Sequence, residues 1–175
     1  GKLFACDHEE IHPDVFMLAK AISGGFMPVS VVTADNEVMD VFTPGIHGST
    51  YGGNPLGAAV CIAALNVLVD EKLPERAAEL GAYFMEKLQR INSPHVKEIR
   101  GRGLTIGIEV KEESGVARPF CEALLKKGIL AKETHASVIR FAPPLVITRE
   151  EIDWALERIE AVLTVEAPVT SRAAV

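Results

Sequence analysis

The residue whose setting most clearly points to chemistry is a lysine near the start of the sequence. Lys20 follows the apolar run Val15–Leu18 and precedes residues 23–25, Ser-Gly-Gly. Lysines rarely lie in apolar surroundings. An amine withdrawn from water loses its proton more easily and can then attack a carbonyl to form a Schiff base. The alternative is a lysine at a strand end that extends its ammonium group to water.

A second group of candidates lies in residues 47–55, HGSTYGGNP, which lead into a helix expected to start at Asn54. Backbone N–H groups and the positive end of the helix dipole bind anions at such a position, phosphate above all. Ser49 and Thr50 add hydroxyl donors. The segment lacks the Gly-Lys-Ser/Thr ending of a nucleotide-binding phosphate loop. It is therefore interpreted as either an anion-binding loop or a plain capped connection.

Arg140 lies in residues 137–145, SVIRFAPPL. A guanidinium group between apolar neighbours needs a carboxylate or a phosphate for its N–H groups. That partner is either a bound anion or a glutamate of the same fold, and the sequence leaves both open.

Residues 8–12, HEEIH, have the spacing of the zinc-binding HExxH motif, which works when a helix places both imidazoles on one face. Pro13 follows at once, and no apolar face would hold a helix there. We therefore expect a solvated loop and no metal site. The other histidines considered, His95 and His135, are expected to be satisfied surface residues.

The composition bounds the class of protein. The 175 residues are 48% apolar and 24% charged, with a net charge of -6. This length corresponds to one domain or slightly more. The acidic balance argues against a nucleic-acid partner, which calls for a basic surface. The longest apolar stretch, residues 58–69, is too short to span a bilayer, and no signal peptide opens the sequence.

The three cysteines also bear on location and packing. Their number is odd and no CxxC pair occurs, which favours a reducing cytoplasm over a disulfide framework. Cys61 and Cys121 lie on apolar faces of expected helices, so both should belong to the core.

The first half of the chain offers few elements to position these residues. A short buried strand or a helix turn is predicted at Val15–Leu18, and a buried strand at Pro28–Thr33. A short helix capped by Asp35 should reach Phe42, and a glycine-rich loop should follow. The helix from Asn54 to about Glu71 is apolar on nearly every face and is therefore expected to be buried.

The second half has more amphipathic patterning. A helix is predicted from Pro74 to about Ile91 and another over Val116–Lys127, ended by Gly128. A last helix, ending near Leu163, should carry a capping box of Thr148 and Glu151. Strands are predicted at Val96–Arg100, Leu104–Val110, Ile129–Ala131 and Val138–Phe141. The fold class is α/β, with a boundary near Leu73 and a frayed tail over residues 164–175.

Three segments together resemble the class III pyridoxal-phosphate-dependent aminotransferases. They are residues 18–25 (LAKAISGG), 47–57 (HGSTYGGNPLG) and 138–145 (VIRFAPPL), and they occur in the family's order. The resemblance extends from Gly1 to about Leu163. Within the family, Tyr51 and residues 130–135 (LAKETH) make the chain most similar to the ornithine aminotransferases.

The resemblance implies a role for each candidate. Lys20 would bind pyridoxal 5'-phosphate covalently and move a proton between substrate and cofactor. Ser49 and Thr50 would reach the cofactor phosphate from a neighbouring subunit, and Arg140 would bind the carboxylate of the amino acid or of 2-oxoglutarate. Residues 1–73 would be the end of the large domain of a fold-type I transferase, and residues 74–163 its small α/β domain.

The implied reaction moves the δ-amino group of ornithine to 2-oxoglutarate, giving glutamate semialdehyde and glutamate, in the cytoplasm and without a metal. Acetylornithine or another ω-amino acid is the alternative donor. The family's N-terminal part, which holds the aspartate for the pyridine nitrogen and the aromatic residue stacked on the ring, has no counterpart here. We therefore expect a homodimer or pairing with that missing half; a non-catalytic fragment is the alternative of another class.

Overall fold

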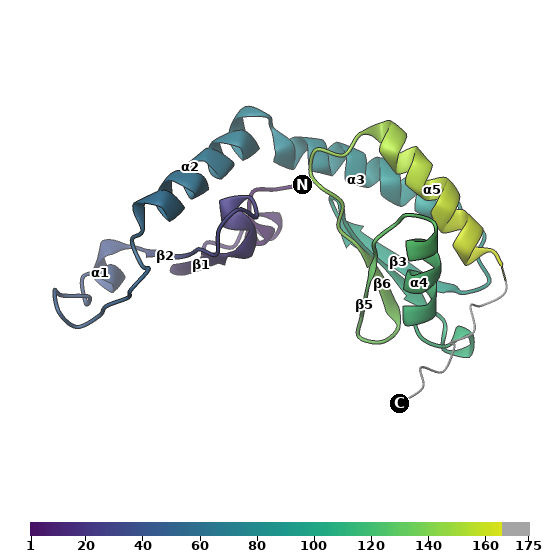
Figure 1. Ribbon diagram of the computed structural model, residues 1–175, viewed down its shortest axis with the longest axis horizontal. Helices are drawn as coiled ribbons and strands as arrows, with labels where there is room; N and C mark the ends of the chain where they lie inside the picture. The colour runs from purple at the N-terminus through teal and green to yellow at the C-terminus, as the bar shows by residue number, and fades with distance from the viewer. Residues whose placement is uncertain (166–175) are drawn as a thin grey trace. The chain divides into compact units, whose positions relative to one another are not determined.

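The computed structural model describes residues 1–165 and contains both helices and antiparallel sheets (Figure 1). Its contacts divide the chain into two units. The first unit is Lys2–Leu73, and the second begins at Pro74 and includes Gly1. The tail expected over residues 164–175 lies almost entirely outside the described residues.

The first unit contains a two-stranded antiparallel sheet. β1 (Val15–Ala19) pairs with β2 (Ser30–Ala34), and the 3-10 turns η1 (Ala5–His8) and η2 (Lys20–Ser23) flank β1. The predicted strands are confirmed, although β2 starts two residues later than expected. Pro28 has no N–H to give to a ladder, so it lies outside the strand.

The expectation that this strand is buried is wrong. Val32 of β2 is 53% exposed and Met17 of β1 is 82% exposed. A sheet of two strands leaves much of its surface uncovered by the described residues. The short helix α1 (Asn36–Met39) follows β2, with Asp35 at its N-cap but without a side-chain cap hydrogen bond.

The long helix of the first unit, α2 (Pro55–Asp70), has the predicted bounds. Asn54 caps it as expected, because its Oδ1 accepts from the N–H groups of Leu56 at 2.9 Å and Gly57 at 3.2 Å. The expectation that α2 is buried is wrong, since only Gly57 and Cys61 are buried. The first unit has too little sheet to cover a helix that is apolar all round.

The second unit is a four-stranded antiparallel sheet in the order β3-β4-β6-β5. Its strands are β3 (Val96–Arg102), β4 (Thr105–Val110), β5 (Lys132–Thr134) and β6 (Val138–Phe141). Its helices are α3 (Leu73–Gln89), α4 (Arg118–Lys126) and α5 (Arg149–Leu163), and the 3-10 turn η3 (Glu112–Ser114) follows β4.

One face of this sheet forms the core with all three helices. Alternate residues of β4 and β6 are buried there against side chains of α3, α4 and α5: Ile106, Ile108, Val110, Ile139, Phe141, Phe84, Leu88, Phe120, Leu124, Ile152 and Ile159. The intervening strand residues therefore lie on the opposite face. Cys121 also belongs to this core, as predicted, and burial raises the pKa of its thiol to about 11.

Several boundary predictions are wrong, among them the end of α1, which lies at Met39 and not at Phe42. Residues 129–131 do not form a strand, because Gly128 has a positive φ of 85° and the Ile129 N–H closes the end of α4 on the Leu124 carbonyl. The strand comes three residues later as β5, where Lys132 lies opposite Arg140. The helix α4 starts at Arg118, two residues after the predicted start.

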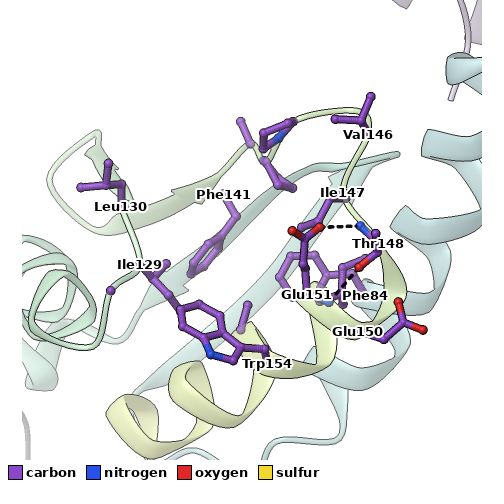
Figure 2. Close-up of a pocket in the computed structure, with 16 residues that line it drawn as sticks. Phe84, Ile129, Leu130, Phe141, Val146, Ile147, Thr148, Glu150, Glu151 and Trp154 are labelled. Atoms are coloured by element: carbon purple, nitrogen blue, oxygen red, sulfur yellow. Dashed lines mark hydrogen bonds between the residues drawn. The ribbon is translucent and has the colours of Figure 1, made fainter.

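The capping box of α5 is confirmed. The Glu151 N–H donates to Thr148 Oγ1 at 3.1 Å, and the Thr148 N–H donates to Glu151 Oε2 at 2.8 Å (Figure 2). His95, by contrast, is buried and not a surface residue. Its Nδ1 lies 2.9 Å from Ser114 Oγ and its Nε2 lies 2.7 Å from the Val165 carbonyl oxygen.

Within the described part of the chain, no helix is long and apolar enough to cross a membrane.

Candidate functional site

Lys20 stands where the first sheet ends. It follows the last residue of β1 and opens η2 with a φ of +54°, in the left-handed region. Non-glycine residues seldom adopt this conformation, and those that do are concentrated at functional sites. The expected apolar surroundings are not found, because the described residues leave Lys20 exposed. The chain turns out of the sheet at this point, so no neighbouring strand covers the side chain.

The turn after Lys20 is held by a serine that the sequence reasoning did not single out. Ser23 is 1% exposed, and its hydroxyl donates to the Met27 carbonyl at 2.5 Å. Gly24 and Gly25, both with positive φ, form the turn between them. A serine directly before two glycines is a local signal of such a side-chain-closed turn. Ser23 thus fixes the backbone that follows the lysine.

The loop over residues 47–53 offers hydroxyl groups, but fewer free N–H groups than expected. Ser49 and Thr50 are exposed, and Ser49 Oγ accepts from the Gly52 N–H at 2.9 Å. The first N–H groups of α2 are already bonded to Asn54 Oδ1. Anion binding by these helix N–H groups is therefore not supported, and the hydroxyls of Ser49 and Thr50 are the available side-chain donors.

A hollow of about 580 Å³ lies beside this loop within the first unit. It is lined by Ser49, Tyr51, residues 52–54, the first turns of α2 and residues 27–31. Cys61 is among its lining residues and is buried, as predicted for a core cysteine. The hollow brings the loop and β2 together, and Lys20 is not among its lining residues.

Arg140 lies on β6, on the face of the sheet opposite the helices. Its neighbours on both sides, Ile139 and Phe141, point into the core, so Arg140 is exposed. Lys132 on β5 and Gly107 on β4 lie directly opposite it. Within residues 1–165, Arg140 makes no ion pair or side-chain hydrogen bond. A structural ion pair with a glutamate, one of the two interpretations of this arginine, therefore finds no partner in the described chain.

The other charged groups on this face are paired. Arg100 Nη1 contacts Glu98 at 2.7 Å and Glu109 at 2.6 Å, and Lys97 Nζ contacts Glu109 at 2.6 Å. The hydrogen bonds from Lys97 and then Arg100 hold the pKa of the Glu109 carboxyl below its usual range. Within residues 1–165, Arg140 is thus a cation without an ion-pair partner, beside charges that are paired with one another.

Among the described residues, no hydrogen bond or ion pair connects Lys20 to Ser49 or Thr50. Arg140 belongs to the second unit, whereas the other three belong to the first.

A hollow in the second unit has a different character (Figure 2). It measures about 960 Å³ and is lined by aromatic and aliphatic side chains, among them Phe84, Phe141 and Trp154. Its charged residues are Glu150 and Glu151, and it has no cationic side chain. It therefore does not suit a phosphate or a carboxylate.

The HExxH segment does not form a helix that presents both histidines. His8 ends η1, and His12 lies just before Pro13 in a segment without regular secondary structure. In the chain up to residue 165, no group of three or more His, Cys, Asp or Glu side chains could hold a metal ion.

Known proteins resemble this chain over nearly its whole length. An ornithine aminotransferase of Staphylococcus epidermidis is 62% identical over 162 residues, which are 93% of this chain and 40% of the relative. An ornithine aminotransferase structure from Toxoplasma gondii has a TM-score of 0.88 at 48% identity, covering 93% of this chain and 39% of that one. An acetylornithine aminotransferase structure from Elizabethkingia anophelis has a TM-score of 0.87 at 46% identity, covering 93% and 41%.

The chain thus spans about 40% of the length of the relatives that it matches. The family described as Aminotransferase class-III matches residues 1–163. A match over this much of the sequence, together with the structural similarity, shows that the chain belongs to the class III aminotransferases.

Proposed function

We propose that this chain supplies part of the active site of an aminotransferase that uses pyridoxal 5'-phosphate. The enzyme would transfer the δ-amino group of ornithine to 2-oxoglutarate, giving glutamate semialdehyde and glutamate. The observation that carries this proposal is the 62% identity to a protein named ornithine aminotransferase over 93% of the chain. The reaction belongs to the whole enzyme, of which this chain corresponds to about 40% in its relatives.

The residues of the first unit fit the cofactor. When bound, pyridoxal phosphate supplies an aldehyde for the amino group and a ring that withdraws electrons from the substrate carbon. Lys20 offers an accessible primary amine on a constrained backbone. The hydroxyls of Ser49 and Thr50 are accessible donors for a phosphate. The related Toxoplasma structure is described with this cofactor at its active site, which supports the assignment.

Each residue would then have one task. Lys20 Nζ would hold the cofactor and, once free, take up and return the proton at the substrate carbon. Ser49 and Thr50 would bind the phosphate of the neighbouring subunit's cofactor. Arg140, which has no partner within the described chain, would bind a carboxylate of 2-oxoglutarate through its two-pronged guanidinium group.

The larger assembly is part of the same proposal. Residues 1–73 would be the end of the large cofactor-binding domain and residues 74–163 the small domain. The enzyme would act as a cytoplasmic homodimer, or this chain would pair with a separate N-terminal half. The apolar side chains left exposed in the first unit are consistent with such a covering partner: Met17, Phe26, Val32, Leu56, Ile62 and Val69.

Acetylornithine is the second candidate donor, favoured by the 46% identity to the Elizabethkingia acetylornithine aminotransferase. Comparing kcat/KM of the holoenzyme for ornithine and for acetylornithine decides between them. A higher value for ornithine is expected, and a higher value for acetylornithine would replace the proposed substrate. Another ω-amino acid would appear as a third donor in the same comparison.

A non-catalytic fragment is the alternative from another class. Pyridoxal phosphate bound to a lysine absorbs at roughly 410–430 nm, so a yellow holoprotein is expected. Borohydride reduction followed by peptide mapping should then label Lys20, and a Lys20→Ala variant should remain unlabelled. A colourless protein would favour the fragment. A label on another lysine, with Lys20 clean, would overturn the assignment.

A further inference from the structure

Lys20 begins a constrained connection between the two strands of the first sheet. Ala19, the last residue of β1, pairs with Ser30, the first residue of β2, so the connection over residues 20–29 starts and ends at fixed points. Lys20 enters it with a φ of +54°. A non-glycine residue in this strained region keeps its conformation only where the surrounding structure imposes it. Strand pairing holds the Ala19 side of Lys20, and a second constraint is needed on the other side.

Ser23 supplies the second constraint. It is 1% exposed, and its hydroxyl donates to the Met27 carbonyl at 2.5 Å and accepts from the Met27 N–H at 3.4 Å. The Ser23 carbonyl also accepts from the Phe26 N–H at 3.2 Å. A serine hydroxyl can make both side-chain bonds at once, because it is a donor and an acceptor. Residues 23–27 therefore form a closed turn, and only two residues separate this turn from Lys20.

The closed turn is packed against α2 at both of its ends. A Cβ at Gly24 would lie 3.4 Å from the Ala64 Cβ, so the backbone of the turn lies close to this helix. At the other end, a Cβ at Gly57 in the first turns of α2 would lie 3.6 Å from Met27 Sδ. Met27 also lines the hollow beside the loop over residues 47–53. The turn is therefore a fixed point to which the backbone at the lysine is tied.

We infer that Ser23 is a positioning residue for the chemistry of Lys20. Its buried hydroxyl keeps the turn closed, which holds Lys20 in the left-handed region and fixes the direction in which the amine extends. Without the hydroxyl, Gly24 and Gly25 can change their dihedral angles at little cost, and Lys20 can relax to a negative φ. The inference rests on the proposed function, in which Lys20 Nζ holds the cofactor and moves a proton at the substrate carbon.

The test is Ser23→Ala, measured in the holoenzyme and in the apoenzyme. We expect kcat to fall about 10- to 100-fold, because a displacement of about 1 Å in a reacting group is enough for the larger loss. The KM for the amino donor should stay within about twofold of the parent. Titration of the apoenzyme should show an affinity for pyridoxal phosphate about tenfold lower, since the displaced amine bonds to the cofactor less readily. Ser23→Cys, which keeps a weak donor, should give intermediate values and replaces Ser23→Ala if that variant does not fold.

A double-mutant cycle separates an action through Lys20 from a general loss of structure. In a Lys20→Ala background the cofactor can bind only noncovalently. Ser23→Ala should then change the affinity for pyridoxal phosphate less than about twofold. An equal loss of affinity in both backgrounds would overturn the inference, because the serine would then act on the fold and not through the lysine.

The matched control is Ser93→Ala in the second unit. Ser93 Oγ donates to the Leu163 carbonyl at 2.6 Å and accepts from the His95 N–H at 3.1 Å, so the substitution removes the same pair of bonds. It should lower the free energy of unfolding but leave kcat and cofactor affinity unchanged. A loss of kcat equal to that of Ser23→Ala would show that reduced stability is the cause, and the inference would fail.

Borohydride labelling separates the inference from the function on which it rests. If reduction of the parent holoenzyme does not label Lys20, the proposed function and the positioning role both fail. If Lys20 is labelled in the parent, and Ser23→Ala keeps the parent's kcat and cofactor affinity, the proposed function stands and the positioning role is wrong.

Discussion

Replacing Gly81 by alanine tests how tightly α3 is packed against the β3–β4 hairpin. Gly81 is a buried residue inside α3, and a Cβ there would lie 2.6 Å from the Gly103 Cα and closer still to its carbonyl group. Real Cβ atoms essentially never approach so closely, and the contacted atoms are backbone. The helix or the hairpin turn would therefore have to move.

Two effects of opposite sign decide the outcome. Alanine is favoured over glycine inside a helix by about 1 kcal/mol. Overpacking costs about 1–3 kcal/mol, and a backbone-to-backbone clash belongs at the upper end of that range because no rotamer change relieves it. We therefore expect Gly81→Ala to reduce the free energy of unfolding of the second unit by about 2 kcal/mol.

Urea unfolding followed by the fluorescence of Trp154, the single tryptophan, measures this change. Repeating it at two protein concentrations separates association from stability. Ala82→Gly, at the adjacent exposed position of α3, is the control and should lose about 1 kcal/mol from helix propensity alone. A Gly81→Ala variant as stable as the parent, or more stable, would show that the close approach does not constrain the helix.

Three further predictions follow from the structure. Thr50→Ala should weaken the affinity of the holoenzyme for pyridoxal phosphate by about 1–3 kcal/mol, and unchanged affinity by fluorescence titration would argue against phosphate binding by this loop. The Glu133 carboxyl has a pKa lowered to about 2 by its own backbone N–H, Lys132 and Arg118; its stabilising contribution is present above the unfolded pKa of about 4.5 and is lost as pH falls toward 2. The urea midpoint of unfolding should therefore fall less steeply between pH 4.5 and pH 2 in Glu133→Gln than in the parent. An identical dependence of the midpoint on pH in both proteins would contradict this. Nearly all fully buried apolar residues belong to the second unit. Hydrogen exchange of the 175-residue chain should therefore show less protection in the first unit, and size-exclusion chromatography should show that the chain associates. A monomer whose two units are equally protected would refute this.

Elements whose signals are local could be predicted from the sequence. The capping box of Thr148 and Glu151, the Asn54-Pro55 start of α2 and the strand before Lys20 each depend on residues a few positions apart. Helix caps and short-range periodicity act within one or two turns of chain, so their physical causes are contained in a short stretch of sequence. The family motifs around Lys20 and Arg140 are of the same local kind.

Burial was predicted less well, because it depends on what covers an element. The apolar pattern of α2 correctly indicated a helix but not its exposed surface in the described chain. His95 was expected at the surface, yet it is buried by its bonds to Ser114 and Val165, which lie 19 and 70 residues away. The shift of β5 to Lys132–Thr134 likewise follows from its pairing with β6.

The sequence by itself determined the family, and it singled out Lys20, the hydroxyl-bearing loop and Arg140 as candidates, because each lies in a short run of residue types with a defined chemistry. Only the tertiary structure decided that Arg140 has no ion-pair partner within residues 1–165, and that Glu109 is bound by Lys97 and Arg100. Those relations depend on the register of β3, β4 and β6 and on which face each residue occupies. Register brings Glu109 to Arg100 and Lys97, which lie 9 and 12 positions away in the chain, and a shift of one residue would move every side chain to the other face.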